Sequence, residues 1–337
     1  MPWKAIKDPY RIWLSEIILQ QTRVEQGTHY YNKFIQHFSD IKQLAKAQET
    51  EVFKLWEGLG YYSRCKNLIA TARYVADELK GKFPSQYDDI LKLKGIGPYT
   101  AAAISSFAFN LPHAVVDGNV MRVLARYFGI KTPIDSTEGK KYFNALAQQL
   151  LDKKQPALYN QAIMDFGATV CKPQQPLCSE CYLNKHCIAF KEEKVNSLPV
   201  KENRLIKKHR WLYYVIAEYD DGFMIRKRTG KDIWQNLHEF ILLEPGQAID
   251  PGELMQSGEF TSLFGKGFRL VTVSKSYKQQ LTHQTIHAVF IHTVFKKKKI
   301  LEGYKPASRS AIKKLAFPRL ISSYFDGEGR SLFTRIL

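Results

Sequence analysis

This chain of 337 residues lacks the features of a membrane or secreted protein. It contains no run of the roughly 20 consecutive apolar residues that a membrane-spanning helix needs. Its first residues, Met1 to Lys4, lack the basic and then apolar layout of a secretory signal. Acidic residues are also few: 32 Asp and Glu stand against 50 Lys and Arg, a formal net charge of +18. This excess favours a polyanionic partner, above all nucleic acid, although a ribosome-associated or membrane-surface protein would show the same balance.

Cysteine is scarce, with five residues, yet four of them lie close together. Cys65 stands alone, and the other four follow the spacing Cys171-x6-Cys178-x2-Cys181-x5-Cys187. An odd number of cysteines without a secretory signal argues against a disulfide framework and for an intracellular metal or cluster site. Zinc is the generic ligand of a CxxC pair, but zinc modules usually place two short pairs apart. Zinc and an iron–sulfur cluster are therefore both candidates at this point.

The pattern of the chain changes once, near residue 190. Residues 1–190 are almost entirely helical by their apolar spacing, and Asp8 followed by Pro9 predicts the start of the first helix. The charge-rich segment 191–207 predicts an interdomain linker. Short β-rich runs and helical runs mix in residues 208–337, which predicts an α+β domain. Further helices are expected near residues 51–57, 64–80, 86–92, 98–108, 118–128, 138–152, 156–168, 251–257 and 308–325, and strands near residues 211–219, 222–226, 240–243 and 287–295.

A glycine-rich turn between two expected helices predicts a helix-hairpin-helix element at about residues 87–109. The turn at residues 94–98 reads Lys-Gly-Ile-Gly-Pro. Glycines let backbone amides and a helix N-terminus approach a DNA phosphate, which a Cβ atom would keep away, although a lone Gly-x-Gly also fits a plain turn. Asp117 follows downstream, before an expected helix, and fits an ordinary N-cap. A carboxylate fixed at a helix N-terminus could equally stabilise a cationic sugar.

A glutamate on the first expected helix is a candidate general acid. Glu16 lies at helical spacing from Ile12 and Trp13. An apolar environment of this kind would raise the pKa of the carboxyl group and keep it protonated near neutral pH, as a general acid requires. The alternative is an ordinary ion pair with Arg11 or Arg23.

Together these motifs resemble the adenine DNA glycosylases of the MutY type, within the helix-hairpin-helix glycosylase superfamily. The resemblance covers essentially the whole chain and is strongest from Trp3 to Cys187. It implies an all-α helix-hairpin-helix catalytic domain over residues 1–190, with a [4Fe–4S] cluster loop at residues 171–187, and an α+β Nudix-like domain over residues 208–337. The implied cluster ligands are Cys171, Cys178, Cys181 and Cys187. The segments that carry the resemblance are Pro2-Trp3, Asp8-Pro9-Tyr10, Trp13-Leu14-Ser15-Glu16, Leu19-Gln20-Gln21-Thr22, Gly58-Leu59-Gly60-Tyr61-Tyr62-Ser63-Arg64, Asp117-Gly118-Asn119-Val120 and the four cysteines.

The resemblance implies a role in base excision repair. The chain would hydrolyse the N-glycosidic bond of adenine mispaired with 8-oxoguanine or G in double-stranded DNA, after flipping the base out of the duplex, and leave an abasic site. Glu16 would protonate adenine at N7, Asp117 would stabilise the oxocarbenium-like sugar, and Asn119 would orient the site. Residues that match the adenine pocket are Trp3, Lys4, Leu19, Val24 and Gln161, and those that match DNA contacts are Gln21, Thr22, Tyr61, Gly95 and Gly97. Plain core packing is the alternative for the apolar ones.

The residue after the Gly-x-Gly turn separates two reactions. Glycosylases that also cleave the strand carry a lysine nucleophile there, because an amine is required to form a Schiff base. This chain has Tyr99 at that position, which we include among the catalytic residues, and Lys94 before the turn fits a phosphate contact. We therefore expect a monofunctional glycosylase. The alternatives are an endonuclease III-like glycosylase and AP lyase acting on oxidised pyrimidines, and a non-catalytic cluster-bearing DNA-binding protein.

The C-terminal part resembles the lesion-recognition domain of the same family, which is related in fold to Nudix hydrolases. Residues 230–240 correspond to its glycine-to-tryptophan segment, but the acids expected of a Nudix catalytic helix are scattered, so nucleotide hydrolysis is not expected. Leu281-Thr282-His283 aligns with the loop that reads 8-oxoguanine, with Thr in place of Ser and Leu in place of Phe. Thr282 and His283 are the lesion-recognition residues that this alignment implies. A metal site is the alternative for the histidines of this region, His283, His287 and His292.

Three further expectations concern the start of the chain, one basic run, and the assembly and location of the protein. Family members usually have a first helix before the Pro2-Trp3 pair, so we expect either a misassigned start or a missing helix. The run Lys296–Lys299 fits a solvated turn, with a binding site as the alternative. We expect a monomer that acts on DNA in the cytoplasm, associated with the nucleoid if the source is bacterial.

Overall fold

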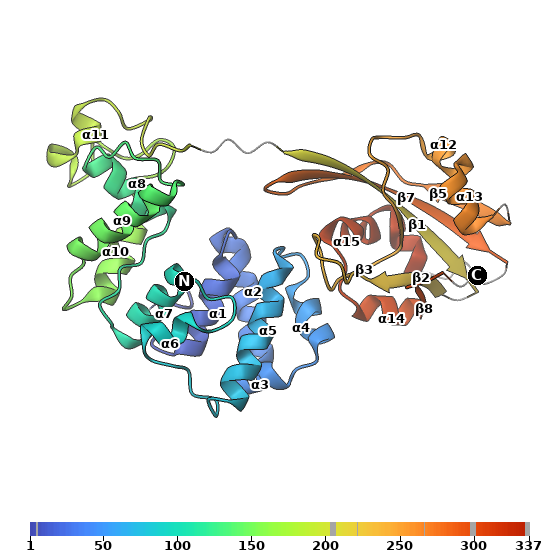
Figure 1. Cartoon of the computed structure of the whole chain (residues 1–337), viewed down its shortest axis with the longest axis horizontal. Coiled ribbons are helices and arrows are strands. Elements are labelled where there is room, and N and C mark those ends of the chain that lie inside the picture. The colour runs from blue at the N-terminus through green and yellow to red at the C-terminus, as the bar shows by residue number, and fades with distance from the viewer. Residues whose placement is uncertain (5, 203–206, 221, 266, 297–300, 334–337) are drawn as a thin grey trace. The chain divides into compact units, whose positions relative to one another are not determined.

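The computed structural model describes residues 1–4, 6–202, 207–220, 222–265, 267–296 and 301–333 (Figure 1). The chain divides into two compact units. The helical unit comprises Met1–Lys46 and Asn67–Arg204, and the sheet unit comprises Ala47–Lys66 and Leu205–Leu337. Among the described residues, no helix combines the length and the apolar composition that crossing a membrane takes.

Helices build the helical unit (Figure 1). The first helix begins where the sequence predicts, because the carboxylate of Asp8 accepts a hydrogen bond from the backbone N–H of Tyr10 at 2.9 Å and Pro9 is the first helical residue. One further helix, α5 (Tyr62–Asp77), begins in the sheet unit and ends in the helical unit. The helices of this unit are α1 (Pro9–Leu19), α2 (Val24–His37), α3 (Ile41–Lys46), α6 (Tyr87–Leu91), α7 (Pro98–Phe109), α8 (Gly118–Tyr127), α9 (Thr137–Leu150), α10 (Pro156–Thr169), η1 (Asn184–His186) and α11 (Ile188–Lys191).

The helix-hairpin-helix element predicted from the glycine-rich turn is confirmed. Helices α6 and α7 pack against each other, and Gly97 is the N-cap of α7. Gly95 has a φ of 80°, and a Cβ atom there would lie 2.6 Å from the Cβ atom of Asn67. Both the backbone conformation and the close approach of α5 therefore require glycine at this position.

Helix α10 connects the two parts of the helical unit that carry the candidate acids. It packs against α8 and α7. Met164 of α10 contacts the core formed by Val120, Leu124 and Phe143, and it also contacts the cluster around Ala103. The first turns of α7 and α8, where Tyr99 and Asp117 lie, are thereby held relative to each other.

The sheet unit contains an eight-stranded mixed sheet, counted over the described residues (Figure 1). The central order is β3-β2-β1-β7-β5, while β4 pairs with β1, β6 with β7 and β8 with β2. Strands β1 and β7 run parallel, from Lys208 opposite Gln284 to Glu218 opposite Val294, and the other described pairs are antiparallel. The strands are β1 (Lys208–Tyr219), β2 (Gly222–Lys227), β3 (His238–Glu239), β4 (Ile241–Leu243), β5 (Phe268–Val273), β6 (Tyr277–Gln280), β7 (Gln284–Phe295) and β8 (Lys305–Ser308).

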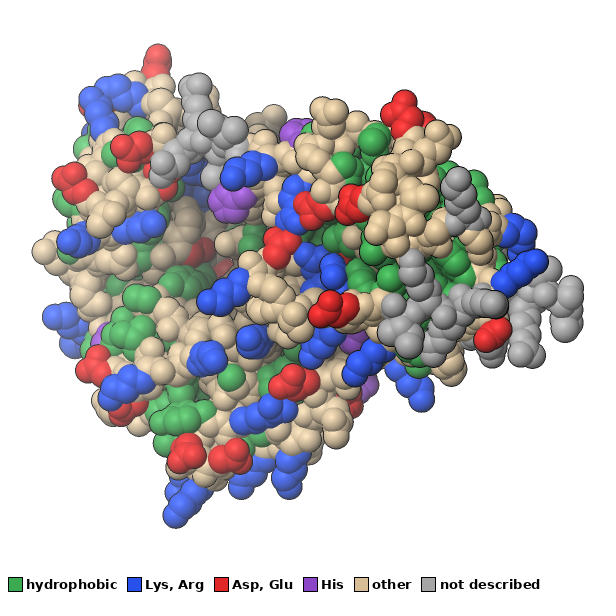
Figure 2. Space-filling view, turned by 45° about the vertical axis from the view of Figure 1, so that its right-hand side comes forward, with side chains coloured by type: hydrophobic (Ala, Val, Ile, Leu, Met, Phe, Trp, Pro, Cys, Tyr) green, Lys and Arg blue, Asp and Glu red, His purple; other side chains and the backbone are tan. Residues whose placement is uncertain are grey.

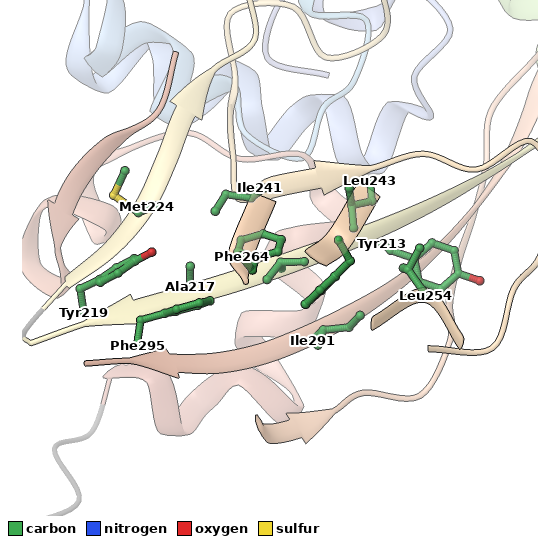
Figure 3. Close-up of a cluster of buried hydrophobic side chains, with 12 residues drawn as sticks. Tyr213, Ala217, Tyr219, Met224, Ile241, Leu243, Leu254, Phe264, Ile291 and Phe295 are labelled. Carbon is green, nitrogen blue, oxygen red and sulfur yellow. The ribbon is translucent and has the colours of Figure 1, made fainter. Parts of the chain in front are cut away.

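Helices cover both faces of this sheet. On one face, Tyr213 and Phe295 pack in a buried cluster with Phe264 of α13 (Gly258–Phe264), and α12 (Pro251–Gln256) adds Leu254 (Figure 3). On the other face, the ring of Phe290 stacks on Tyr324 of α15 (Arg319–Asp326) with 4.1 Å between centroids. The alternation of side chains along a strand places neighbouring residues in these two separate cores.

Several elements differ from the prediction. Helices α2, α3 and α13 and strands β3, β5, β6 and β8 were not expected from the sequence. The helical signal over residues 308–325 is confirmed but divided into two helices, α14 (Arg309–Lys314) and α15. They are separated at Pro318, which disfavours a helical residue before it. The chain continues after α15 with η2 (Glu328–Phe333).

Two sequence predictions fall partly outside the described residues. Of the segment 191–207, residues 203–206 are not described, and the stretch before them is bonded to the helical unit. The N–H of Ile134 donates to the carbonyl of Val200 at 3.0 Å, and the guanidinium of Arg126 donates to the carbonyl of Leu198 at 3.0 Å. Of the run Lys296–Lys299, residues 297–299 are not described.

Candidate active site

Glu16 lies on α1 with its carboxyl group deep in the helical unit. The residue as a whole keeps partial contact with solvent, whereas its carboxyl group is surrounded by protein. Burial raises the pKa of Glu16 from 4.5 to about 7, a hydrogen bond with the hydroxyl of Tyr99 lowers it, and the charge of Asp117 raises it. The sequence left open an ion pair between Glu16 and Arg11. In the structure, the guanidinium of Arg11 lies 3.7 Å from the carboxylate of Asp8 instead. The carboxyl group is therefore suited to hold a proton near neutral pH.

Asp117 occupies the N-cap position of α8, as the sequence predicts. One carboxylate oxygen accepts hydrogen bonds from the backbone N–H groups of Asn119 at 2.9 Å and Val120 at 2.8 Å. The other oxygen accepts a hydrogen bond from the side-chain amide of Asn119 at 2.7 Å. The capping bonds and the positive end of the helix dipole hold this carboxylate in one place.

Tyr99, in the first turn of α7, completes the group. Burial is the main cause that raises the pKa of the Tyr99 hydroxyl well above its usual value, and the charges of Glu16 and Asp117 add to it. The hydroxyl therefore keeps its proton and donates it in the hydrogen bond to Glu16. The structure thus brings together three residues that the sequence names from three separate helices.

Arg122 was not identified from the sequence, although it supports this group. The residue is buried, with 8% of its surface exposed. The guanidinium donates to the side-chain oxygen of Asn119 at 2.8 Å, to the carbonyl of Gly167 at 2.8 Å and to the carbonyl of Cys171 at 2.8 Å. A Cβ atom on Gly167 would lie 2.7 Å from the Cβ atom of Asn119, so α10 approaches α8 closely here. Arg122 therefore connects Asn119 to α10 and to the cysteine segment.

The residues that match an adenine pocket are connected in part. Lys4 and Gln161 share one partner, Asp165: the ammonium of Lys4 lies 2.6 Å from one carboxylate oxygen, and the amide nitrogen of Gln161 donates to the other at 3.0 Å. Asp165 was missed in the sequence, and its only local signal is the helical spacing of four residues from Gln161. Trp3 packs edge-on against Tyr31 with 5.2 Å between ring centroids.

Leu19 and Val24 lie where α1 ends and α2 begins. The side chain of Leu19 lies against Gly27, where an added Cβ atom would be 2.5 Å from it. Val24 is 43% exposed. Leu19 therefore has a packing role in the structure, which is the alternative that the sequence left open, while Val24 is accessible to a ligand.

The predicted DNA contacts lie in both units. Gln21 has a φ of 56° and Thr22 follows it, in the turn between α1 and α2. Gln20, just before them, donates to the hydroxyl of Thr100 on α7 at 3.1 Å, which ties this turn to the hairpin. Tyr61 belongs to the sheet unit, where its hydroxyl lies 2.5 Å from the hydroxyl of Thr282.

The four closely spaced cysteines line one cavity of the helical unit. Arg126 donates to the sulfur of Cys171 at 3.5 Å, and the thiol of Cys187 donates to the carbonyl of Arg126 at 3.4 Å. In the part of the chain that the structure describes, no three Cys, His, Asp or Glu side chains converge as ligands of one metal ion. Apolar residues complete the cavity wall, among them Val123, Phe166, Val170, Leu177, Leu183 and Phe190.

The histidines of the sheet unit make other contacts. His292 lies 2.7 Å from a carboxylate oxygen of Glu218, which also pairs with Arg309. A ring nitrogen of His287 lies 3.1 Å from one of His209. These contacts occupy His287 and His292 with separate partners, and His283 lies exposed beside Thr282 in the turn between β6 and β7.

The fold and the paired carboxyl groups point to a class of DNA repair protein. Residues 14–153 match the family described as HhH-GPD superfamily base excision DNA repair protein. The solved structure of a thermostable thymine-DNA glycosylase is similar, with 32% identity and a TM-score of 0.53, over 57% of this chain and 88% of that one.

Curated relatives narrow this class. The adenine DNA glycosylase of Buchnera aphidicola is 37% identical over 240 residues, which cover 71% of this chain and 69% of that protein. The human adenine DNA glycosylase is 46% identical over 181 residues, which cover 53% of this chain and 33% of that protein. The chain belongs to the adenine DNA glycosylase family.

Proposed function

We propose that the chain is a monofunctional glycosylase of base excision repair, which hydrolyses the N-glycosidic bond of adenine mispaired with 8-oxoguanine or G in double-stranded DNA. The observation that carries this proposal is the buried carboxyl group of Glu16, with a pKa of about 7, held beside Tyr99 and Asp117. A protonated carboxyl group and a fixed carboxylate in one site are what acid-assisted departure of a purine needs. Lys and Arg side chains are scattered over the face seen in Figure 2, among Asp and Glu, and the formal net charge of +18 suits a polyanionic substrate.

The reaction follows from the roles of these groups. The adenine is flipped out of the duplex, because N7 and C1′ are poorly accessible inside the stack. Glu16 gives its proton to N7, which weakens the bond between the base and C1′. Asp117 stabilises the positive charge that develops on the sugar, and Asn119 and Arg122 keep that carboxylate in position. Water then completes the hydrolysis and leaves an abasic site, and Tyr99 offers no amine for strand cleavage.

We also propose that Cys171, Cys178, Cys181 and Cys187 hold a [4Fe–4S] cluster. The donor set fits, because four thiols line one cavity with an apolar wall and two sulfurs already share hydrogen bonds with Arg126. The cluster would supply a rigid fixed point for the cysteine segment rather than a step of the reaction. Measured iron and acid-labile sulfide in the purified protein would support it, whereas stoichiometric zinc without sulfide would contradict it.

The proposed function assigns catalysis and lesion recognition to different domains. We propose a helical catalytic domain over residues 1–190, a linker over 191–207 and a Nudix-like lesion-recognition domain over 208–337, in which Thr282 and His283 read the oxidised guanine. Supporting this are the mixed sheet with helices on both faces and the exposure of Thr282 at its turn. We propose that the chain acts on DNA as a monomer.

The test is base release from a defined duplex. A duplex with one A:8-oxoguanine pair is incubated with the protein and then treated with alkali, which breaks the strand at an abasic site. Breakage at the adenine supports the proposal, and an intact strand contradicts it. Glu16→Gln should bind this duplex but lose base release by at least about a hundredfold, as expected for loss of a general acid. The matched control is Glu25→Gln, an exposed glutamate of α2 that should keep full activity.

A further inference from the structure

Residues 47–66 group with the C-terminal part of the chain, although the neighbouring segments on both sides belong to the helical unit. This segment contains α4 (Glu49–Trp56) and the loop that leads to Tyr61. Two charged residues at the end of α4, Lys54 and Glu57, bond this segment to the C-terminal part of the sheet unit.

Glu57 binds the start of α15. One carboxylate oxygen accepts a hydrogen bond from the backbone N–H of Phe317 at 3.2 Å and another from the hydroxyl of Ser322 at 2.6 Å. The other oxygen lies 2.5 Å from the ammonium of Lys54, which also donates to the carbonyl of Leu315 at 2.9 Å. The Glu57 side chain is only 17% exposed. These bonds are therefore partly shielded from water and worth more than a surface ion pair.

The position of this carboxylate has a physical reason. Helix α15 begins after Pro318, which offers no side-chain cap. A negative charge near the first turn of a helix is favourable because of the helix dipole and the unpaired backbone N–H groups. Glu57, distant in sequence, supplies the charge that the local sequence of α15 lacks.

The loop after Glu57 is held in one conformation. Gly58 and Gly60 have φ angles of 92° and 78°, and Tyr61 has a φ of 46°. The indole N–H of Trp56 donates to the carbonyl of Gly60 at 2.9 Å. The guanidinium of Arg64 lies 5.3 Å from the ring of Trp56 and 5.4 Å from the ring of Tyr61. Because these contacts restrain the loop at Gly58, Gly60 and Tyr61, and Trp56 lies next to Glu57, we expect the position of Tyr61 to depend on the position of Glu57.

We propose that Glu57 is a positioning residue: by binding the start of α15 it fixes the loop that carries Tyr61, so that Tyr61 and Thr282 present one continuous DNA-reading edge. The inference rests on the proposed function, because it assigns lesion recognition to that edge. The edge includes Tyr61, which is 44% exposed, and Thr282, whose hydroxyl it contacts. The carboxylate of Glu57 touches no DNA in this arrangement and acts through the loop.

The consequence is a change in preference rather than a uniform loss of binding. If the loop is released, Tyr61 and Thr282 no longer keep their spacing, and the contact that distinguishes 8-oxoguanine from guanine weakens. The positive charge of the protein still binds the phosphates of any duplex. The ratio of the two affinities should therefore fall, while binding to an undamaged duplex changes less.

The experiment compares dissociation constants for two duplexes. Each contains an uncleavable abasic analogue, opposite 8-oxoguanine in one and opposite G in the other. Wild-type protein should prefer the 8-oxoguanine duplex, and Glu57→Ala should reduce this preference about tenfold, the effect of losing hydrogen bonds to one charged group. Glu57→Gln should lie between them, because an amide oxygen still accepts from Phe317 and Ser322 but loses the ion pair with Lys54. Ser322→Ala should move the preference in the same direction by a smaller factor.

The matched control is Glu51→Gln, which removes a charge from an exposed position of the same helix. It should keep the wild-type preference. If Glu57→Ala lowers the melting temperature but leaves the preference unchanged, the role of Glu57 is only structural and the inference is overturned. Equal weakening on both duplexes overturns it as well. Failure of the wild-type protein to release adenine would contradict the proposed function, and the binding ratio would still decide the role of Glu57.

Discussion

The charge of Asp117 raises the pKa of Glu16, which shows that the two carboxyl groups lie within electrostatic reach of each other although they come from α1 and α8. Burial is the larger cause, and the hydrogen bond from Tyr99 acts in the opposite direction. The result is an acid with a pKa of about 7 beside a carboxylate that two backbone N–H groups hold in place. Burial thus raises the pKa of the Glu16 carboxyl group, while capping bonds fix the position of the Asp117 carboxylate.

The rate of base release should depend on pH through Glu16. Its protonated form is the proton donor, so the rate should be highest below the pKa of about 7 and fall as the pH rises through that value. The measurement is the single-turnover rate of adenine release on the A:8-oxoguanine duplex across this range. A rate that stays constant through pH 7 would mean that another group supplies the proton.

Stability should depend on pH with the same sign. The pKa of Glu16 is raised in the folded protein, so its contribution to stability is fully present below its unfolded value of 4.5 and is lost as the pH rises through about 7. The gap between these values corresponds to about 3 kcal/mol. Glu16→Gln carries no charge to bury and should therefore be more stable than the wild type above pH 7. Urea unfolding of both proteins at about pH 4.5 and about pH 8 measures the difference, which should be small at the lower pH and grow as the pH rises toward the folded pKa of about 7.

Substitutions of Asp117 should separate its two roles. Asp117→Asn keeps a side-chain oxygen that can accept from the N–H groups of α8, so stability should fall by less than about 1 kcal/mol. Base release should nevertheless fall strongly, because the charge opposite the sugar is gone. Asp117→Ala should lose both, with a further destabilisation of about 1 kcal/mol. If Asp117→Asn keeps wild-type turnover, the residue is a helix cap and nothing more.

Asp165 should control the orientation of Gln161. A carboxylate only accepts hydrogen bonds, so it turns the amide nitrogen of Gln161 toward itself and leaves the amide oxygen available on the other side. Asp165→Asn removes this constraint and the ion pair with Lys4. We expect adenine release to fall by roughly threefold to tenfold, with little loss of stability, since both partners of the ion pair are partly exposed. Glu138→Gln, at an exposed position of α9, is the control and should leave the rate unchanged.

The sequence predicts those parts of the fold that carry a local signal. The start of α1 follows from Asp8 and Pro9, and the hairpin from its two glycines. Helix α2 was missed because its only buried residues are Gly27, Tyr31 and Phe34, too few for a clear apolar stripe. Strand β5 was missed because most of its residues are exposed on both faces, so polar and apolar residues do not alternate.

In the candidate site, too, the sequence predicts only those residues that carry a local signal. Glu16, Tyr99 and Asp117 stand out because each has a recognisable neighbourhood in the sequence. Asp165 and Glu57 do not, since their partners Lys4 and Ser322 lie 161 and 265 residues away. Each of these two acidic residues has its role because of a contact with a residue far away in the sequence. No pattern in the neighbouring sequence predicts such a contact.

The parallel pairing of β1 with β7 has a consequence for synthesis of the chain. These two strands form the middle of the sheet, yet a long stretch of sequence separates them. During translation, β1 leaves the ribosome before β7, so its apolar residues and one unpaired backbone edge stay exposed until β7 has been made. Pairing of the two strands is then slow, because closing so long a loop costs chain entropy that local contacts do not offset. The N-terminal helices can fold in the meantime. A premature stop before residue 284 should therefore yield an aggregation-prone protein, whose insoluble fraction reports the missing strand.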